Sequence, residues 1–112
     1  MDFDWSVAVP FIVQYEGIEG MNGKVYARTS DTMGTINDLI PYGDDSFYCL
    51  PYIDSFGDTY FSSLQMEIFL PEWERVKDRA ETPLQAEAWT QVYQLAKYVA
   101  EHPHSFLHFR GD

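Results

Sequence analysis

Residues 52–80 read YIDSFGDTYFSSLQMEIFLPEWERVKDRA, and this stretch contains the change from strand-like alternation to helical periodicity that decides the fold. Ser62 and Gln65 have the S-x-x-Q spacing of a capping box, in which the hydroxyl accepts from the N3 amide and the Gln side chain returns to the N-cap amide. The box predicts a helix that begins near Ser62. Pro71 has no amide hydrogen, so it predicts a kink or a restart before this helix ends near Ala80.

Upstream of this stretch, the sequence is typical of strands. Apolar residues occupy every odd position from Phe3 to Tyr15, a period of two that predicts a strand. Asn22-Gly23 is the preferred pair for a hairpin turn, so Lys24 to Thr29 should form the returning strand. Residues 35–39 could form a single helical turn. Phe47 to Ile53 is rich in aromatic and β-branched residues and predicts a third strand.

Downstream, a second S/T-x-x-Q box, Thr82 to Gln85, has proline at the first helical position. It predicts a long amphipathic helix from Pro83 that ends before Pro103. Ser105 to Arg110 is short and alternating, as expected of a last strand. The predicted order is therefore β-β-β-α-α-β. We expect residues 1–112 to form a single α+β domain, a mostly antiparallel four-stranded sheet with two helices packed on one face.

Composition limits the class of protein. The chain has 112 residues, 46% of them hydrophobic, and a formal net charge of −11. The hydrophobic content argues against disorder in spite of the charge. Cys49 is the single cysteine, so no internal disulfide can form, which favours a reducing compartment. The N-terminal MDFDW is acidic where a signal peptide is basic, and no apolar run is long enough to span a membrane. We expect a cytoplasmic protein with no membrane contact.

The histidines and a short acidic turn are the candidate metal ligands. His102, His104 and His108 lie near the C-terminus, but no carboxylate or thiol spacing completes a known metal pattern. Solvated histidines at a helix end are the simpler interpretation. Asp54 and Asp58 lack the regular alternation of a calcium loop, so a turn is favoured there. The sequence predicts neither a metal nor a cofactor.

Catalytic groups are equally sparse. Cys49 sits in an apolar run, where a buried and inert thiol is expected. Asp44 and Asp45 are the most conspicuous carboxylate pair, and an exposed acidic loop explains them. There is no glycine-rich phosphate loop and no nucleophile motif. We therefore predict that the protein is not an enzyme.

Charge is distributed unevenly along the chain. Residues 1–74 contain thirteen Asp or Glu and two basic residues, whereas residues 75–112 contain five of each sign. Such a negative field repels nucleic acid and favours a basic protein partner, although acidity can also serve solubility alone. The eight Tyr and three Trp suggest an interface, where these residue types are enriched. The predicted partner-binding residues are the loop acids Asp44, Asp45, Asp54 and Asp58, with Tyr42 and Tyr60 as aromatic anchors.

Residues 54–65 also carry the pattern D-x-x-G-D-T-x-F-x-x-x-Q. Its fixed positions are Asp54, Gly57, Asp58, Thr59, Phe61 and Gln65. This segment resembles one in small acidic bacterial proteins, largely uncharacterised, of the toxin-immunity type. The resemblance covers twelve of the 112 residues. It implies a bacterial origin and a binding role, and it provides no catalytic residues.

Two functions therefore follow from the sequence. The first is a small acidic binding module, an immunity protein or inhibitor that neutralises a basic toxin such as a nuclease. The alternative is a small enzyme or ligand-binding domain with a pocket between sheet and helices. A toxin gene beside this one would favour the first, and a deep polar pocket the second. The sequence defines neither the partner nor the oligomeric state.

Overall fold

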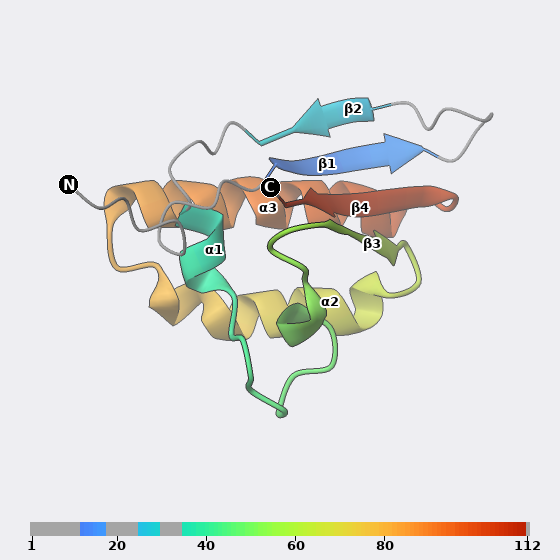
Figure 1. Ribbon diagram of the computed structural model, residues 1–112. Helices are drawn as coiled ribbons and strands as arrows, with labels where there is room; N and C mark the ends of the chain where they lie inside the picture. Colours follow the sequence, from blue (N-terminus) through green and yellow to red (C-terminus); the bar gives the residue numbers. More distant parts are fainter. Residues whose placement is uncertain (1–11, 18–24, 30–34, 112) are drawn as a thin grey trace.

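Figure 1 shows the computed structural model of the chain, which describes residues 12–17, 25–29 and 35–111. Strands and helices together form an α+β fold. In chain order the elements are β1 (Ile12–Gly17), β2 (Val25–Arg28), α1 (Thr35–Leu39), the 3₁₀ helix η1 (Leu50–Tyr52), β3 (Asp58–Ser62), α2 (Met66–Arg75), the 3₁₀ helix η2 (Val76–Arg79), α3 (Pro83–Glu101) and β4 (Ser105–Arg110).

The strands form one antiparallel sheet in the order β2-β1-β4-β3. The central pair joins distant parts of the chain, since β1 runs beside β4 from Ile12 opposite Arg110 to Gly17 opposite Ser105. On the other side of β4, Phe61 lies opposite Leu107 and Tyr60 lies opposite His108. Facing residues of an antiparallel pair point to the same side, so these two pairs belong to opposite faces of the sheet.

The helices cover the face that carries Phe61 and Leu107. Helix α3 contacts β1 and β4, and α2 packs along α3 (Figure 1). Phe69 of α2 reaches the sheet, with its ring centroid 5.2 Å from that of Phe61 and 5.9 Å from that of Phe109. All of these side chains are buried. The core is thus a layer of aromatic and aliphatic groups between the sheet and α2 and α3.

Two tryptophans join α2 to α3. The indole Nε1 of Trp73 donates to the carbonyl of Trp89 at 3.0 Å, and the indole of Trp89 donates to the carbonyl of Trp73 at 2.8 Å. Both side chains are buried. Because each indole satisfies its single donor on the other helix, the pair fixes how the two helices sit together.

The predicted arrangement β-β-β-α-α-β with two helices is wrong. Among the described residues, the observed order is β-β-α-β-α-α-β, with three α-helices. Residues 47–53, predicted as the third strand, form a loop and η1 instead. The third strand in the chain is β3, which lies where the sequence predicted a turn and the start of a helix.

Residues 47–53 do not form a strand because three of their amides bind the buried Glu72. Its Oε2 accepts from the amide of Tyr48 at 2.5 Å, and its Oε1 accepts from Cys49 at 3.0 Å and Leu50 at 3.2 Å. Successive amides of a strand point to alternate sides, so three consecutive amides cannot converge on one carboxylate in an extended chain. Pro51, in the first turn of η1, removes a further ladder donor.

Ser62 has two roles, since it ends β3 and also caps the turn that leads into α2. The capping-box bonds are present: Ser62 N donates to Gln65 Oε1 at 2.8 Å, and Gln65 N donates to Ser62 Oγ at 3.3 Å. Because Ser62 also ends β3, the first turn is closed by tighter bonds such as Gln65 N to Ser62 O, and α2 begins only at Met66. The predicted restart at Pro71 does not occur, since Pro71 lies inside α2.

The predictions for α3, β4 and α1 are confirmed. Helix α3 starts at Pro83, and the Thr82–Gln85 capping box is complete. β4 spans the predicted Ser105–Arg110, and α1 coincides with the helical turn predicted at residues 35–39. The first part of the predicted N-terminal strand, residues 3–11, and the Asn22-Gly23 turn lie outside the described residues. β1 and β2 are the described parts of the first two predicted strands.

Candidate functional site

Exposed aromatic side chains are concentrated in residues 42–60, which we call the aromatic segment. It holds five of the six large aromatic side chains that are exposed among the described residues, namely Tyr42, Tyr48, Tyr52, Phe56 and Tyr60. Tyr48, Tyr52 and Phe56 are 79%, 75% and 71% exposed. The segment also contains four Asp and no basic residue. An exposed aromatic surface is a feature of protein interaction sites.

Tyr42 and Asp54 lie close together. The Tyr42 hydroxyl donates to Asn37 Oδ1 at 2.8 Å. Partial burial raises the pKa of Tyr42 to about 12; a hydrogen bond with Ser55 opposes this rise and the Asp54 carboxylate adds to it. Tyr42 is therefore neutral and held in place, with its ring still partly exposed, as an anchor residue requires.

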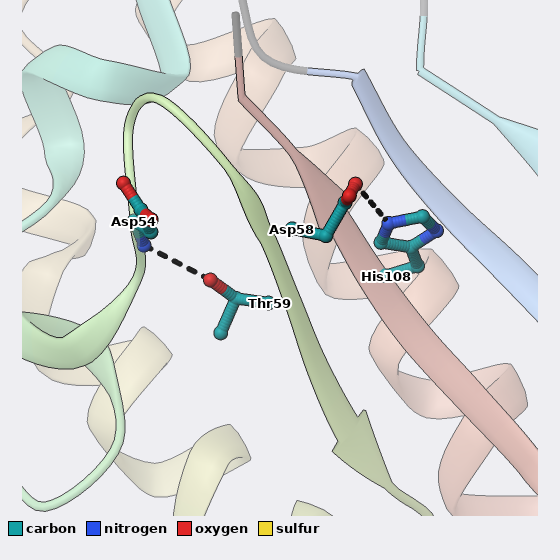
Figure 2. Close-up of polar contacts among 4 residues, drawn as sticks. All are labelled: Asp54, Asp58, Thr59 and His108. Atoms are coloured by element: carbon teal, nitrogen blue, oxygen red, sulfur yellow. Dashed lines mark hydrogen bonds and ion pairs between the residues drawn. The ribbon is translucent and has the colours of Figure 1, made fainter.

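Asp54 organises the turn that precedes β3 (Figure 2). Its Oδ1 accepts from Phe56 N at 2.9 Å, and its own amide donates to Thr59 Oγ1 at 2.9 Å. A Cβ at Gly57 would lie 2.6 Å from Asp54 Oδ2, so a larger residue there would displace this carboxylate. Gly111 N donates to Gly57 O at 2.6 Å and ties the end of β4 to the turn. Asp54 therefore shapes the backbone that presents Phe56.

Asp58 and Tyr60 meet on His108. The imidazole Nε2 lies 2.8 Å from Asp58 Oδ1 (Figure 2), and the Tyr60 ring stacks on the imidazole with centroids 4.0 Å apart and planes 18° apart. The His108 side chain is only 7% exposed, whereas that of Asp58 is 61% exposed. Sequence reasoning had favoured a solvated role for the histidines. His102 and His104 are exposed, but for the buried His108 that interpretation is wrong.

Asp44 lies apart from these groups, in the loop between α1 and η1 that projects away from the sheet (Figure 1). Its Oδ1 accepts from the Ser46 hydroxyl at 2.7 Å and the Ser46 amide at 2.9 Å. These bonds lower the pKa of Asp44, and the nearby Arg75 and Arg79 add to the effect. Asp45 is exposed. The six predicted residues thus form two pairs, Tyr42 with Asp54 and Asp58 with Tyr60, and a separate acidic loop.

Sequence reasoning missed Glu72, which anchors the aromatic segment to α2. Its carboxylate holds the amides of Tyr48, Cys49 and Leu50, so the backbone between the exposed Tyr48 and Tyr52 rests on the helix. Burial raises the pKa of the Cys49 thiol to about 11, and Glu72 adds to this rise. The thiol is therefore protonated near neutral pH, which agrees with an inert role.

A shallow groove of about 590 Å³ lies elsewhere, between the start of α2 and the turn from α3 to β4. Its lining includes the apolar residues Leu64, Leu70, Pro103 and Phe106 and the polar residues Ser62, Glu67 and His104. Within the described parts of the chain, no three His, Cys, Asp or Glu side chains are placed to hold a metal ion. None of the helices described combines the length and apolar character that a membrane crossing needs.

Comparison with known proteins identifies no relative: no family model, curated protein or solved structure matches this chain.

Proposed function

We propose that the protein is a binding module for a basic protein partner, and most specifically an immunity protein or inhibitor that neutralises a basic toxin such as a nuclease. The observation that carries this proposal is the aromatic segment, where exposed Tyr and Phe side chains alternate with carboxylates. Aromatic anchors provide most of the energy of typical interfaces, and complementary charge speeds their formation. Binding of this kind needs no catalytic group.

The scaffold favours such a role because the segment is held at several points. Glu72 fixes it at Cys49 and Leu50, Thr59 accepts from the Asp54 amide, and Gly111 donates to Gly57. Binding residues are often carried by loops that a rigid framework positions. A surface that is already ordered loses less conformational entropy on association, so a small area can bind tightly.

The charge distribution indicates what kind of partner would bind. Residues 1–74 carry the whole excess charge of −11 and include the aromatic segment. A surface of this sign attracts a positively charged protein and repels nucleic acid phosphates. A nuclease that binds nucleic acid through a basic surface has the complementary charge. Occupation of that surface by the aromatic segment would block the nuclease.

The proposal can be tested by affinity purification from the native host, with mass spectrometry of co-eluting proteins. The test variant replaces Tyr48, Tyr52 and Phe56 by Ser, and a control replaces the exposed Leu64 and Leu84 by Ser. We expect a basic protein to co-elute with the wild type and the control, but not with the test variant. Its association rate should fall as salt is added.

Circular dichroism should give the same spectrum for both variants, because all the altered side chains are exposed. A partner that is itself acidic, or one retained by the folded test variant, would contradict the proposal. If the partner is a toxin, the purified protein should inhibit it at one-to-one stoichiometry.

The groove beside α2 supports a second candidate, a small enzyme or ligand-binding domain. Its volume is sufficient for a small molecule, and its lining is mainly apolar. Ala100 lines this groove on the exposed side of α3, so Ala100→Trp would fill it. A small molecule that stabilises the wild type but not this variant would favour the second candidate over the first.

A further inference from the structure

Phe56 lies in the centre of the turn that leads into β3. Of the phenylalanines that the structure describes, only this one is exposed, by 71%, and no ring or cation of the described residues contacts it. Its chain neighbours, Ser55 and Gly57, are two of the smallest residues, so little stands beside the ring. Unlike the exposed tyrosines, a phenyl ring has no hydroxyl that water can hydrate. Its transfer from water into an apolar environment is therefore favourable for the whole side chain.

The turn that carries Phe56 is fixed by several hydrogen bonds. Within it, the Gly57 amide donates to the Asp54 carbonyl at 3.4 Å, and the Phe56 amide donates to Asp54 Oδ1 at 2.9 Å. The Asp54 amide donates to Thr59 Oγ1 and joins the turn to β3 (Figure 2). Gly111 N donates to Gly57 O and joins it to the end of β4. Because the backbone at Phe56 is already ordered, binding through its side chain costs little conformational entropy.

The Asp54 carboxylate lies beside the backbone of Phe56. Its Oδ1 is 2.9 Å from Phe56 N, and its Oδ2 is on the side of Gly57, where a Cβ would lie 2.6 Å away. Asp54 is exposed, and among the described residues no donor bonds to its Oδ2. A surface that closes around the Phe56 ring must also approach this carboxylate. Burial of a charge without a partner is costly, so a matching surface has to place a positive group there.

We infer that Phe56 and Asp54 form one docking element, in which the phenyl ring enters an apolar pocket of the basic partner and the carboxylate pairs with a cationic side chain at the rim of that pocket. An aromatic side chain buries about 150–250 Å² when it is fully enclosed, and an anchor of this kind in a pocket is typical of binding hot spots. The inference rests on the proposed function, since it describes the site by which that partner is held.

The test uses two probes with the chemistry of such a pocket. One is neutral β-cyclodextrin, which has an apolar cavity, and the other is its monoamino derivative, which carries one ammonium group at the rim. Each is titrated into the ¹⁵N-labelled protein at neutral pH and constant ionic strength. We expect both probes to shift the amide signals of residues 55–57 more than those of Tyr48 and Tyr52. The monoamino form should bind roughly two- to fivefold more tightly, the range of an exposed ion pair.

Variants separate the roles of the ring and the carboxylate. Phe56→Ser should abolish binding of both probes at the turn. Asp54→Asn should remove the preference for the monoamino form and leave binding of the neutral form unchanged, because an Asn oxygen still accepts from the Phe56 amide. The matched control is Glu101→Gln, which removes the same charge from an exposed position at the end of α3, beyond the other end of β4. This control should leave the preference unchanged.

Equal affinity for the two probes, larger shifts at Tyr48 or Tyr52 than at Phe56, or a preference that survives Asp54→Asn would overturn the inference. Once a partner is isolated, Phe56→Ser alone should weaken its binding by about tenfold or more, and Tyr48→Ser by less. A partner that binds Phe56→Ser as tightly as the wild type would also overturn it.

These results are separable from those for the proposed function. If the Ser variant of Tyr48, Tyr52 and Phe56 loses the partner while neither cyclodextrin binds at Phe56, the proposed function stands and the docking element is refuted. If both cyclodextrins bind as expected while that variant keeps the partner, the proposed function is refuted and the docking chemistry of Phe56 and Asp54 stands.

Discussion

Replacing Glu72 tests the interaction that holds the aromatic segment to α2. In Glu72→Ala the amides of Cys49 and Leu50 lose their acceptor inside the core, and the partly buried amide of Tyr48 loses its acceptor near the surface. Each buried amide without a partner costs about 1–3 kcal/mol. The two buried amides together should therefore lower the free energy of unfolding by about 2–6 kcal/mol.

Glu72→Gln separates the charge from the shape. A carboxamide has one acceptor oxygen where the carboxylate has two, and its NH₂ group faces donors. It can keep the bonds to Cys49 and Leu50, which both go to Oε1, but not the bond to Tyr48. We expect a loss of about 1–3 kcal/mol for this variant, smaller than that of the alanine variant.

Urea denaturation measures both losses, and amide hydrogen exchange locates them. Exchange at Cys49 and Leu50 should accelerate in Glu72→Ala more than exchange in α3. The matched control is Glu74→Ala, an exposed glutamate of the same helix whose Oε1 accepts from the Tyr93 hydroxyl at 3.2 Å. The control should lose less than about 1 kcal/mol. If Glu72→Ala is no less stable than this control, the carboxylate does not hold the segment.

Three further predictions concern the rest of the fold. Trp89→Ala should lower the free energy of unfolding by about 3–5 kcal/mol in urea denaturation, because it removes a buried ring and leaves the Trp73 carbonyl without its donor; a loss under about 1 kcal/mol would be inconsistent with this packing. Gly111→Ala should be more destabilising than Gly57→Ala in thermal unfolding. A Cβ at Gly111 would meet the backbone of Ser55, whereas a Cβ at Gly57 would meet the Asp54 side chain, which can move. The opposite order would show that the turn at Asp54 is the more rigid of the two. Tyr42 should ionise near pH 12 in a phenolate absorbance titration, whereas its pKa in the unfolded chain is close to 10.0. Because the unfolded state releases the proton first, the free energy of unfolding should fall as the pH rises from about 10 to about 12. Tyr42→Phe should reduce that fall, and an unchanged pH profile of this variant would contradict the assignment.

Local signals predicted the elements whose hydrogen bonds are local. The Thr82–Gln85 box and Pro103 bracket α3, and each acts within a few residues, so its bounds could be read from the sequence. The prediction of a strand at residues 47–53 was wrong for the opposite reason. Their composition favours a strand, but the acceptor for their amides is Glu72, a residue more than twenty positions away on another element.

The candidate site was predicted in part. Exposed tyrosines and acids in the aromatic segment follow from composition, and Asp58 and Tyr60 share a face because they are two apart on a strand. The role of His108 could not be predicted, because it depends on the register between β3 and β4. The hydrogen bonds from Ser46 that lower the pKa of Asp44 are local, whereas the smaller contribution of Arg75 depends on folding, which brings this side chain to the loop.

The place of β4 in the sheet has a consequence for biosynthesis. β1 and β3 do not touch each other; each is paired with β4, which is the last strand of the described chain. During translation both strands lack this partner until residues 105–110 leave the ribosome. The β1–β2 pair alone is only marginally stable in water. A chain that stops before β4 therefore cannot assemble the sheet, and it also lacks the Gly111 amide that ties down the turn before β3. Such incomplete chains would remain exposed to proteases.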